Sequence, residues 1–143
     1  MTLTLPRRLT ATACLTLTLT ACGFSTDPFD YGDGKRIRLA VEQLFGELER
    51  ADYTAAASHW CDAAGAAPPT ADELRADFTD LARPWKTKLV SSQHTDDGTG
   101  FANLTLTDGG GAGHPYNVDF HLTGDAAEVC DVDTGTIQID VDV

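Results

Sequence analysis

The spacing of apolar residues changes once along the chain, near its middle. Between residues 35 and 83, apolar side chains recur every three or four positions, which is the period of an amphipathic helix. The longest such stretch predicts a helix with Asp33 as its N-cap and an end near Ala51. The apolar side of this helix consists of Ile37, Ala40, Val41, Leu44, Phe45 and Leu48.

Two shorter helices are expected next. Asp52 can cap an alanine-rich helix that continues to Gly65, before the prolines at 68 and 69. Thr70 and Glu73 have the spacing of a capping box, so a third helix is expected to begin there and to stop before Pro84. The apolar sides of these two helices carry Tyr53, Ala57, Trp60 and Cys61 in the first and Leu74, Phe78 and Leu81 in the second.

After Trp85 the apolar period becomes two, which is typical of strands with one buried face. Strands are expected around residues 103–107, 116–122, 128–132 and 137–143. Turns are expected at Asp97-Gly98, at residues 109–113 and at Gly124-Asp125. Helices followed by an antiparallel meander predict a single α+β domain in which N-terminal helices pack on the sheet.

The beginning of the chain has the composition of an export signal. Arg7 and Arg8 supply a positive charge, and residues 9–19 form an apolar stretch that is too short to cross a bilayer. Residues 19–22, Leu-Thr-Ala-Cys, resemble the lipobox of bacterial lipoproteins. This resemblance implies that Cys22 is joined to lipid and becomes the first residue after cleavage. Ordinary signal cleavage, which would release a secreted soluble protein, is the alternative.

The lipobox divides the chain into a signal at 1–21, a lipidated tether at 22–34 and a single α+β domain at 35–143. Phe24, Phe29 and Tyr31 are unusual in a tether, and they either dock on the domain or lie against the membrane interface. Attachment is expected through lipid on Cys22, at the extracytoplasmic face of the cell membrane.

The charge of the chain limits its partners. The formal net charge is -12, and the loss of Arg7 and Arg8 changes it to -14. An acidic surface repels nucleic-acid phosphates and anionic lipid headgroups. We therefore expect no nucleic-acid partner, and we expect acyl chains rather than surface charge to hold the protein on the membrane.

The four cysteines have different expected fates. Cys14 lies in the signal and Cys22 is the lipid site, which leaves Cys61 and Cys130. Two thiols in an oxidising compartment suggest one disulfide, and two unrelated buried thiols are the alternative. A bridge between them would close a loop of about seventy residues and, in the chain-entropy model, stabilise the fold by roughly 4 kcal/mol.

The order of elements resembles the nuclear transport factor 2-like family, and especially its small bacterial envelope lipoproteins. This resemblance implies a curved, cone-like sheet and a bridge from a helix-two cysteine to a late-strand cysteine, here Cys61 to Cys130. The chain departs from the family pattern at residues 126–127, where an aromatic residue is common, and in its last strand. The matching pieces are the lipobox at Cys22, the stripe 37–48, the stretch 51–61 and the segment 124–130.

The family includes isomerases and dehydratases, which use an acidic residue, a histidine or a tyrosine inside an apolar cone. Successive residues of a strand face opposite sides of the sheet, so Asp119 and His121 are expected to point away from the apolar side, which carries Tyr116 and Phe120. Glu128 shares its parity with Cys130, so it is the one strand carboxylate expected to face inward, unless a bulge intervenes. An exposed glutamate at a strand end is the alternative.

Neither a metal nor a cofactor is expected. His114 and His121 fall on opposite strand faces, while His59 and His94 are isolated, so the histidines do not converge as zinc ligands. Residues 96–100 fit a hairpin turn better than a calcium loop. The chain has neither a G-x-S-x-G motif nor a glycine-rich phosphate loop before a helix.

Three function classes stay open. A binding module for an apolar small molecule or an envelope partner, without catalytic residues, is favoured. The alternatives are an isomerase or dehydratase that uses Glu128 or a pocket tyrosine, and a purely structural envelope protein. The residues expected to line a pocket, if they do not simply fill the core, are Trp60, Trp85, Tyr116, Phe120 and Glu128.

Overall fold

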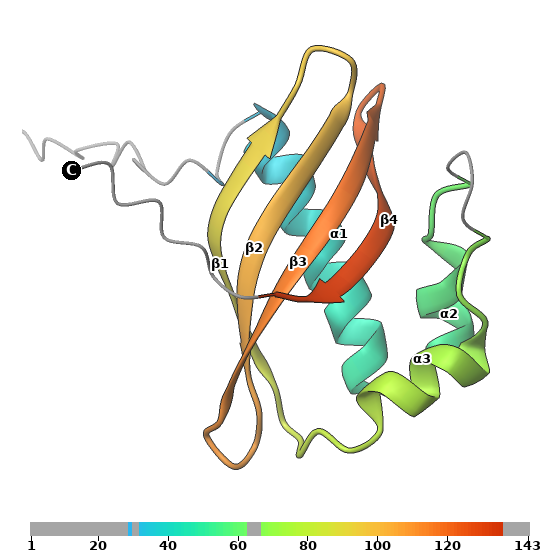
Figure 1. Ribbon diagram of the computed structural model, residues 1–143, viewed down its shortest axis with the longest axis vertical. Helices are drawn as coiled ribbons and strands as arrows, with labels where there is room; N and C mark the ends of the chain where they lie inside the picture. The colour runs from blue at the N-terminus through green and yellow to red at the C-terminus, as the bar shows by residue number, and fades with distance from the viewer. Residues whose placement is uncertain (1–28, 30–31, 63–66, 136–143) are drawn as a thin grey trace, which may run out of the picture.

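The computed structural model describes residues 29, 32–62 and 67–135 of the chain. The expected signal, Cys22, residues 22–28 and 30–31 of the tether, and the expected strand at 137–143 lie outside these residues. Within them, no helix is long and apolar enough to cross a membrane. The elements are α1 (Gly32–Glu49), α2 (Tyr53–Ser58), α3 (Ala71–Phe78), β1 (Lys86–His94), β2 (Thr99–Thr107), β3 (Gly113–Thr123) and β4 (Ala126–Thr134) (Figure 1).

The longest helix, α1, lies along one face of the sheet (Figure 1). The apolar side predicted for this helix is buried, except that Ala40 is partly exposed. Asp33 is not the N-cap: α1 begins at Gly32, and Asp33 in the first turn instead contacts Arg36 and His94. The helix ends close to the predicted position, where Ala51 adopts a left-handed φ of 57°.

The second helix is shorter than predicted. It ends at Ser58, so the expectation that it continues to Gly65 with Trp60 and Cys61 on its apolar side was wrong. Trp60 instead forms a parallel β-bridge with Val129, and the Cys61 N–H donates to the Val129 carbonyl over 2.6 Å. A six-residue helix has few hydrogen bonds of its own, so the open edge of β4 competes successfully for this backbone.

The third helix has the predicted start. The Thr70 hydroxyl accepts a hydrogen bond from the Glu73 N–H at 3.3 Å, and the Thr70 N–H donates to Glu73 Oε2 at 2.7 Å. These two bonds form the capping box that the spacing predicted. The helix ends at Phe78, so Leu81 lies beyond it, although its side chain still packs against the core.

The strands form one antiparallel sheet in the order β1-β2-β3-β4. The predicted turns connect them at residues 95–98, 108–112 and 124–125. The first strand, β1, was anticipated only through the turn that follows it, because its side chains are mostly polar and exposed. Its register also shifts between Leu89 and Ser91, which breaks the alternation that marks the other strands.

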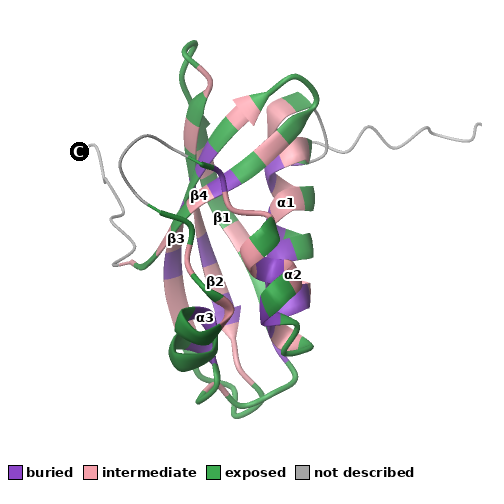
Figure 2. Cartoon of the chain, turned by 90° about the vertical axis from the view of Figure 1, so that its right-hand side faces the viewer, coloured by how far each residue is buried: buried purple, intermediate pink, exposed green. Residues whose placement is uncertain are grey.

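The core lies between α1 and one face of the sheet, which we call the inner face (Figure 2). An aromatic cluster fills its centre: Phe45, Phe78 and Tyr116 have ring centroids 5.7 to 6.2 Å apart, and Trp85 lies 6.2 Å from Phe78. Trp85, Tyr116 and Phe120 are all buried in this core. The α+β class is confirmed, and side chains fill the interior.

Of the three aromatic residues in the tether, the structure describes one, and this residue is docked on the domain. Phe29 is 8% exposed and lines the same small cavity as Val41 of α1 and Leu89 of β1. Of the two alternatives for the tether aromatics, docking therefore holds for Phe29.

Candidate functional site

A β-bulge in β4 determines which side chains reach each face of the sheet. Asp131 lies opposite Asp119, but Val129 lies opposite Phe120, so Cys130 is an extra residue in the strand. As a result Val129 faces the core and is 1% exposed, whereas Glu128 is exposed. The bulge that was named as the exception does intervene, so the inward orientation of Glu128 does not hold and the alternative, an exposed glutamate, does.

The disulfide between Cys61 and Cys130 is present, with Cα atoms 4.9 Å apart. It joins the segment after α2 to β4 at the edge of the sheet. The Trp60 indole N–H donates to the Cys130 carbonyl over 3.0 Å, next to the bridge. The predicted pairing is confirmed, with the correction that Cys61 follows the second helix and does not lie within it.

The face of the sheet opposite to α1, which we call the outer face, carries a cavity of about 630 Å³. Two rows of paired residues form its floor. The first row crosses β1, β2 and β3, and the second crosses β2, β3 and β4. Cys61, Asp62 and Cys130 line its border at the sheet edge. The rows are Gln93, Phe101 and Asp119, and Thr99, His121 and Glu128.

Asp119 and His121 point away from the core, as parity predicted, and both are exposed. The strand pattern does not reveal that this outward face is hollowed, so that both residues line a cavity. Phe101 was also missed. It is 38% exposed, and an aromatic residue at an outward strand position is the signal that could have revealed it.

The cavity lining is acidic. Its carboxylates are those of Asp62, Asp119 and Glu128, and among the described lining residues there is neither lysine nor arginine. Partial burial raises the pKa of Asp119 above its ordinary value, and the negative charges of Asp131 and Asp133 raise it further. The outer face therefore concentrates negative charge around Asp119.

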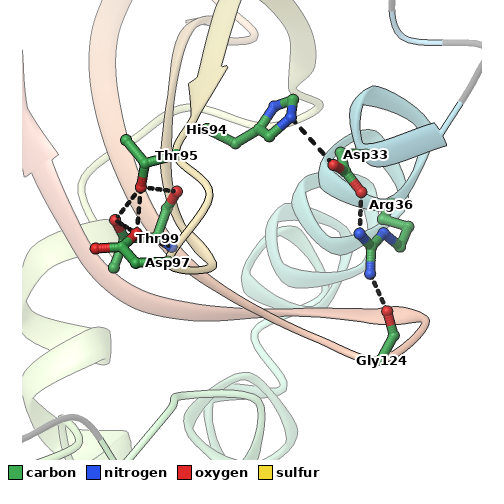
Figure 3. A network of polar contacts seen from close by, with 7 residues as sticks. All are labelled: Asp33, Arg36, His94, Thr95, Asp97, Thr99 and Gly124. Atoms are coloured by element: carbon green, nitrogen blue, oxygen red, sulfur yellow. Dashed lines mark hydrogen bonds and ion pairs between the residues drawn. The ribbon is translucent and has the colours of Figure 1, made fainter.

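A polar network holds together the elements at one end of the sheet (Figure 3). His94 Nε2 lies 3.2 Å from Asp33 Oδ2, and Asp33 also accepts a hydrogen bond from Arg36. Arg36 in turn donates to the carbonyl of Gly124 in the β3–β4 turn. The network thus ties the start of α1 to β1 and to the β3–β4 turn, and His94 also lines the cavity.

Two other histidines, His59 and His114, have structural partners. His59 Nε2 lies 2.9 Å from Glu47 Oε1, and His114 Nε2 lies 2.9 Å from Asp108 Oδ2. Asp108 also accepts hydrogen bonds from backbone N–H groups of the β2–β3 loop. In the parts of the chain that the structure describes, no three His, Cys, Asp or Glu side chains are grouped to hold a metal ion.

The predicted pocket residues are dispersed. Glu128 and Phe120 line the outer-face cavity, Phe120 from a buried position. Trp60 lines a separate cavity of about 420 Å³ between α3 and β4. Trp85 and Tyr116 belong to the packed core. The structure therefore does not bring the five residues together around one site.

Comparison with known proteins identifies the fold. No model of a known protein family matches the chain, and no curated protein matches it. A designed protein, named Rd1NTF2_05 with five substitutions, has a similar solved structure: the TM-score is 0.53 at 13% identity, over 73% of this chain and 100% of that chain. The chain has the nuclear transport factor 2-like fold.

At this identity the nuclear transport factor 2-like neighbour establishes the fold alone. The predicted cone-like α+β architecture is confirmed. The fold is compatible with a ligand-binding module and equally with an enzyme, so the function has to be argued from the site.

Proposed function

We propose that this protein is a lipid-anchored, extracytoplasmic binding module, attached through Cys22, whose outer-face cavity holds a small-molecule ligand without transforming it. The observation that carries this proposal is the distribution of space in the fold. Aromatic and aliphatic side chains pack the centre of the core between α1 and the sheet, where the smaller cavity beside Phe29 measures about 230 Å³, while a cavity of about 630 Å³ lies on the outer face. That volume is in the range of small-molecule sites.

The exposure of the polar groups supports binding over catalysis. A catalytic acid or base works best in a site that excludes water and shifts its pKa towards the working pH. Glu128 and His121, which are paired across β3 and β4, are both exposed. Asp119 is exposed as well, although partial burial raises its pKa. An isomerase mechanism with Glu128 would also require an apolar interior around it, and the bulge at Cys130 directs Glu128 to the other face.

The site can be tested by filling it. Gln93 lines the cavity, and Ser91 is exposed on the same strand and face but does not line it. We expect a fragment library screened against the full-length protein in nonionic detergent to give ligands that shift the amide resonances of Phe101, His121 and Glu128. Gln93→Trp should abolish these shifts, and Ser91→Trp should preserve them.

Two results would contradict the site. Ligands that shift only core residues such as Leu104 and Phe45 would place binding inside the cone. A screen without any ligand at the outer face would favour the structural class. Turnover of a carbonyl substrate that is lost in Glu128→Gln would instead establish an enzyme.

The anchor has its own test. Wild-type protein should enter the detergent phase in phase partitioning, because acyl chains on Cys22 that are sufficient for stable membrane attachment also insert into detergent micelles. Cys22→Ala should remain in the aqueous phase. Cys14→Ala is the matched control, since Cys14 lies in the segment expected to be removed, and it should partition like the wild type. Equal partitioning of Cys22→Ala and wild type would refute the lipid anchor.

A further inference from the structure

Charge is the first property of the outer-face cavity that restricts its ligand. Asp62, Asp119 and Glu128 line it together with His94 and His121, while no lysine or arginine does so among the residues described there. Asp131 and Asp133 add charge on the same strand as Glu128, and their repulsion acts on Asp119. The whole chain carries a formal charge of -12. An anionic ligand would meet repulsion at the cavity and from the surrounding protein.

The second property is an aromatic surface next to this charge. Phe101 on β2 pairs directly with Asp119 on β3, so the two side chains are neighbours on the outer face. At 38% exposure the Phe101 ring is accessible to a ligand. A cation between them would gain attraction from the carboxylate and from the face of the ring. The disulfide of Cys61 and Cys130 adds apolar surface at the border of the cavity.

From these two properties we infer that the outer-face cavity binds an organic cation, an amine or quaternary ammonium group joined to an apolar body. Its charged group lies between Asp119 and Phe101, and its apolar body extends towards the disulfide. This inference rests on the proposed function, because it names the ligand class of the same cavity. A bare metal ion fits less well, because no three ligating side chains are grouped within the described residues.

A matched series of probes tests the ligand class. Phenylbutylammonium, phenylbutanol and phenylbutyrate share one apolar body and differ in charge. We expect calorimetry on the full-length protein in nonionic detergent to show that the ammonium binds about fivefold more tightly than the alcohol, from one exposed ion pair and one cation–π contact. The butyrate should bind more weakly than both. The ammonium should shift the amides of Phe101, Asp119 and Cys61.

Variants separate local recognition from net charge. Asp119→Asn and Phe101→Leu should each weaken ammonium binding about twofold and leave alcohol binding nearly unchanged. Glu42→Gln removes the same charge as Asp119→Asn from an exposed position on α1, on the other side of the sheet. This control should leave the affinity for the ammonium within error of the wild type.

The outcomes distinguish this inference from the proposed function. If the alcohol binds in the cavity as tightly as the ammonium, the ligand class is wrong and the binding site stands. If Glu42→Gln weakens the ammonium as much as Asp119→Asn does, the attraction is a net-charge effect and the inference fails. If the probes leave the cavity amides unmoved while the fragment screen finds ligands there, the inference alone fails. If both experiments leave those amides unmoved, both proposals fail.

Discussion

Arg83 is the residue that connects the helical half of the fold to the start of the sheet. Its guanidinium donates to the carbonyls of Leu48 and Glu49 at the end of α1, the bond to Leu48 being 3.1 Å long. It also donates to the Tyr53 hydroxyl over 3.3 Å and lies 4.9 Å from the centroid of the Trp85 ring. One side chain thus donates to two carbonyls at the helix end and stacks on a core aromatic.

The position of this cation compensates for an unfavourable charge distribution in α1. The helix has Lys35, Arg36 and Arg38 near its beginning and Glu47 and Glu49 near its end, which opposes the helix dipole. Arg83 brings a positive charge to the C-terminal end from outside the helix. Only the folded chain reveals this role, because Arg83 is 34 residues away from Glu49 in the sequence.

We expect Arg83→Ala to lower the free energy of unfolding by about 1–2 kcal/mol, since charge-assisted hydrogen bonds and a cation–π contact are lost together. Arg83→Lys should have an intermediate effect, because lysine keeps the charge but not the planar fork. Urea denaturation measures both. Arg50→Ala is the control: it is an exposed arginine next to the same helix end, and its loss should change stability by about 0.5 kcal/mol or less. Equal effects at the two arginines would contradict the role of Arg83.

At the scale of elements, the β1–β2 turn depends on one carboxylate (Figure 3). Asp97 Oδ1 accepts hydrogen bonds from the Thr99 N–H at 3.0 Å and the Thr99 hydroxyl at 2.7 Å, and also from the Thr95 hydroxyl. Led by the bond from Thr95, these contacts lower the pKa of Asp97 from 3.8 to about 2. The carboxylate is therefore a structural part of the hairpin that borders the cavity.

The sign of the pH effect follows from this lowered pKa. The ionised form of Asp97 stabilises the hairpin at pH values above 3.8, and this stabilisation is lost as the pH falls towards about 2. We expect the Asp97 carboxyl carbon to titrate by NMR with a midpoint near 2. Asp97→Asn should accelerate hydrogen exchange at the Thr99 amide, whereas Asp96→Asn, which removes the same charge from the same turn, should not. A midpoint at 3.8 would contradict the turn network.

Elements set by local signals were predictable from the sequence. The stripe of α1 and the capping box of Thr70 and Glu73 involve residues three or four apart, and both are present in the fold. The end of α2 was not predictable, because the backbone of Cys61 bonds to Val129, far away in the sequence. An edge strand that captures a segment after a helix leaves no local signature.

The site shows the same limit at the scale of the whole molecule. Parity placed Asp119 and His121 correctly on the outer face, but a single extra residue, Cys130, reversed the orientation of Glu128. Cys61 and Asp62 line the cavity at the edge of the sheet. They are distant in the sequence from the strands that they border, so no local sequence pattern predicts this contact. The sequence predicted which residues form the core, but it did not predict where the cavity lies.

The disulfide acts on the whole molecule, because it joins the helical half to the last described strand across a sequence separation of 69 residues. A bridge that closes a loop of this length is strongly stabilising, because loss of a native disulfide from a small domain costs about 2–5 kcal/mol. Cys61 also has a backbone bond to Val129, so the bridge and the added β-contact reinforce one another. Breaking the bridge should therefore loosen the border of the outer-face cavity as well as the fold.

We expect reducing agent to lower the free energy of unfolding of the wild type by about 2–5 kcal/mol in urea denaturation. The double variant Cys61→Ser with Cys130→Ser should start at this lower stability and show no response to the reductant, which excludes a general effect of the reagent. Amide exchange at Cys61 should accelerate more than at Ala102, which lies in the buried centre of β2. Unchanged stability on reduction, or uniform acceleration at both amides, would show that the sheet edge holds Cys61 without the bridge.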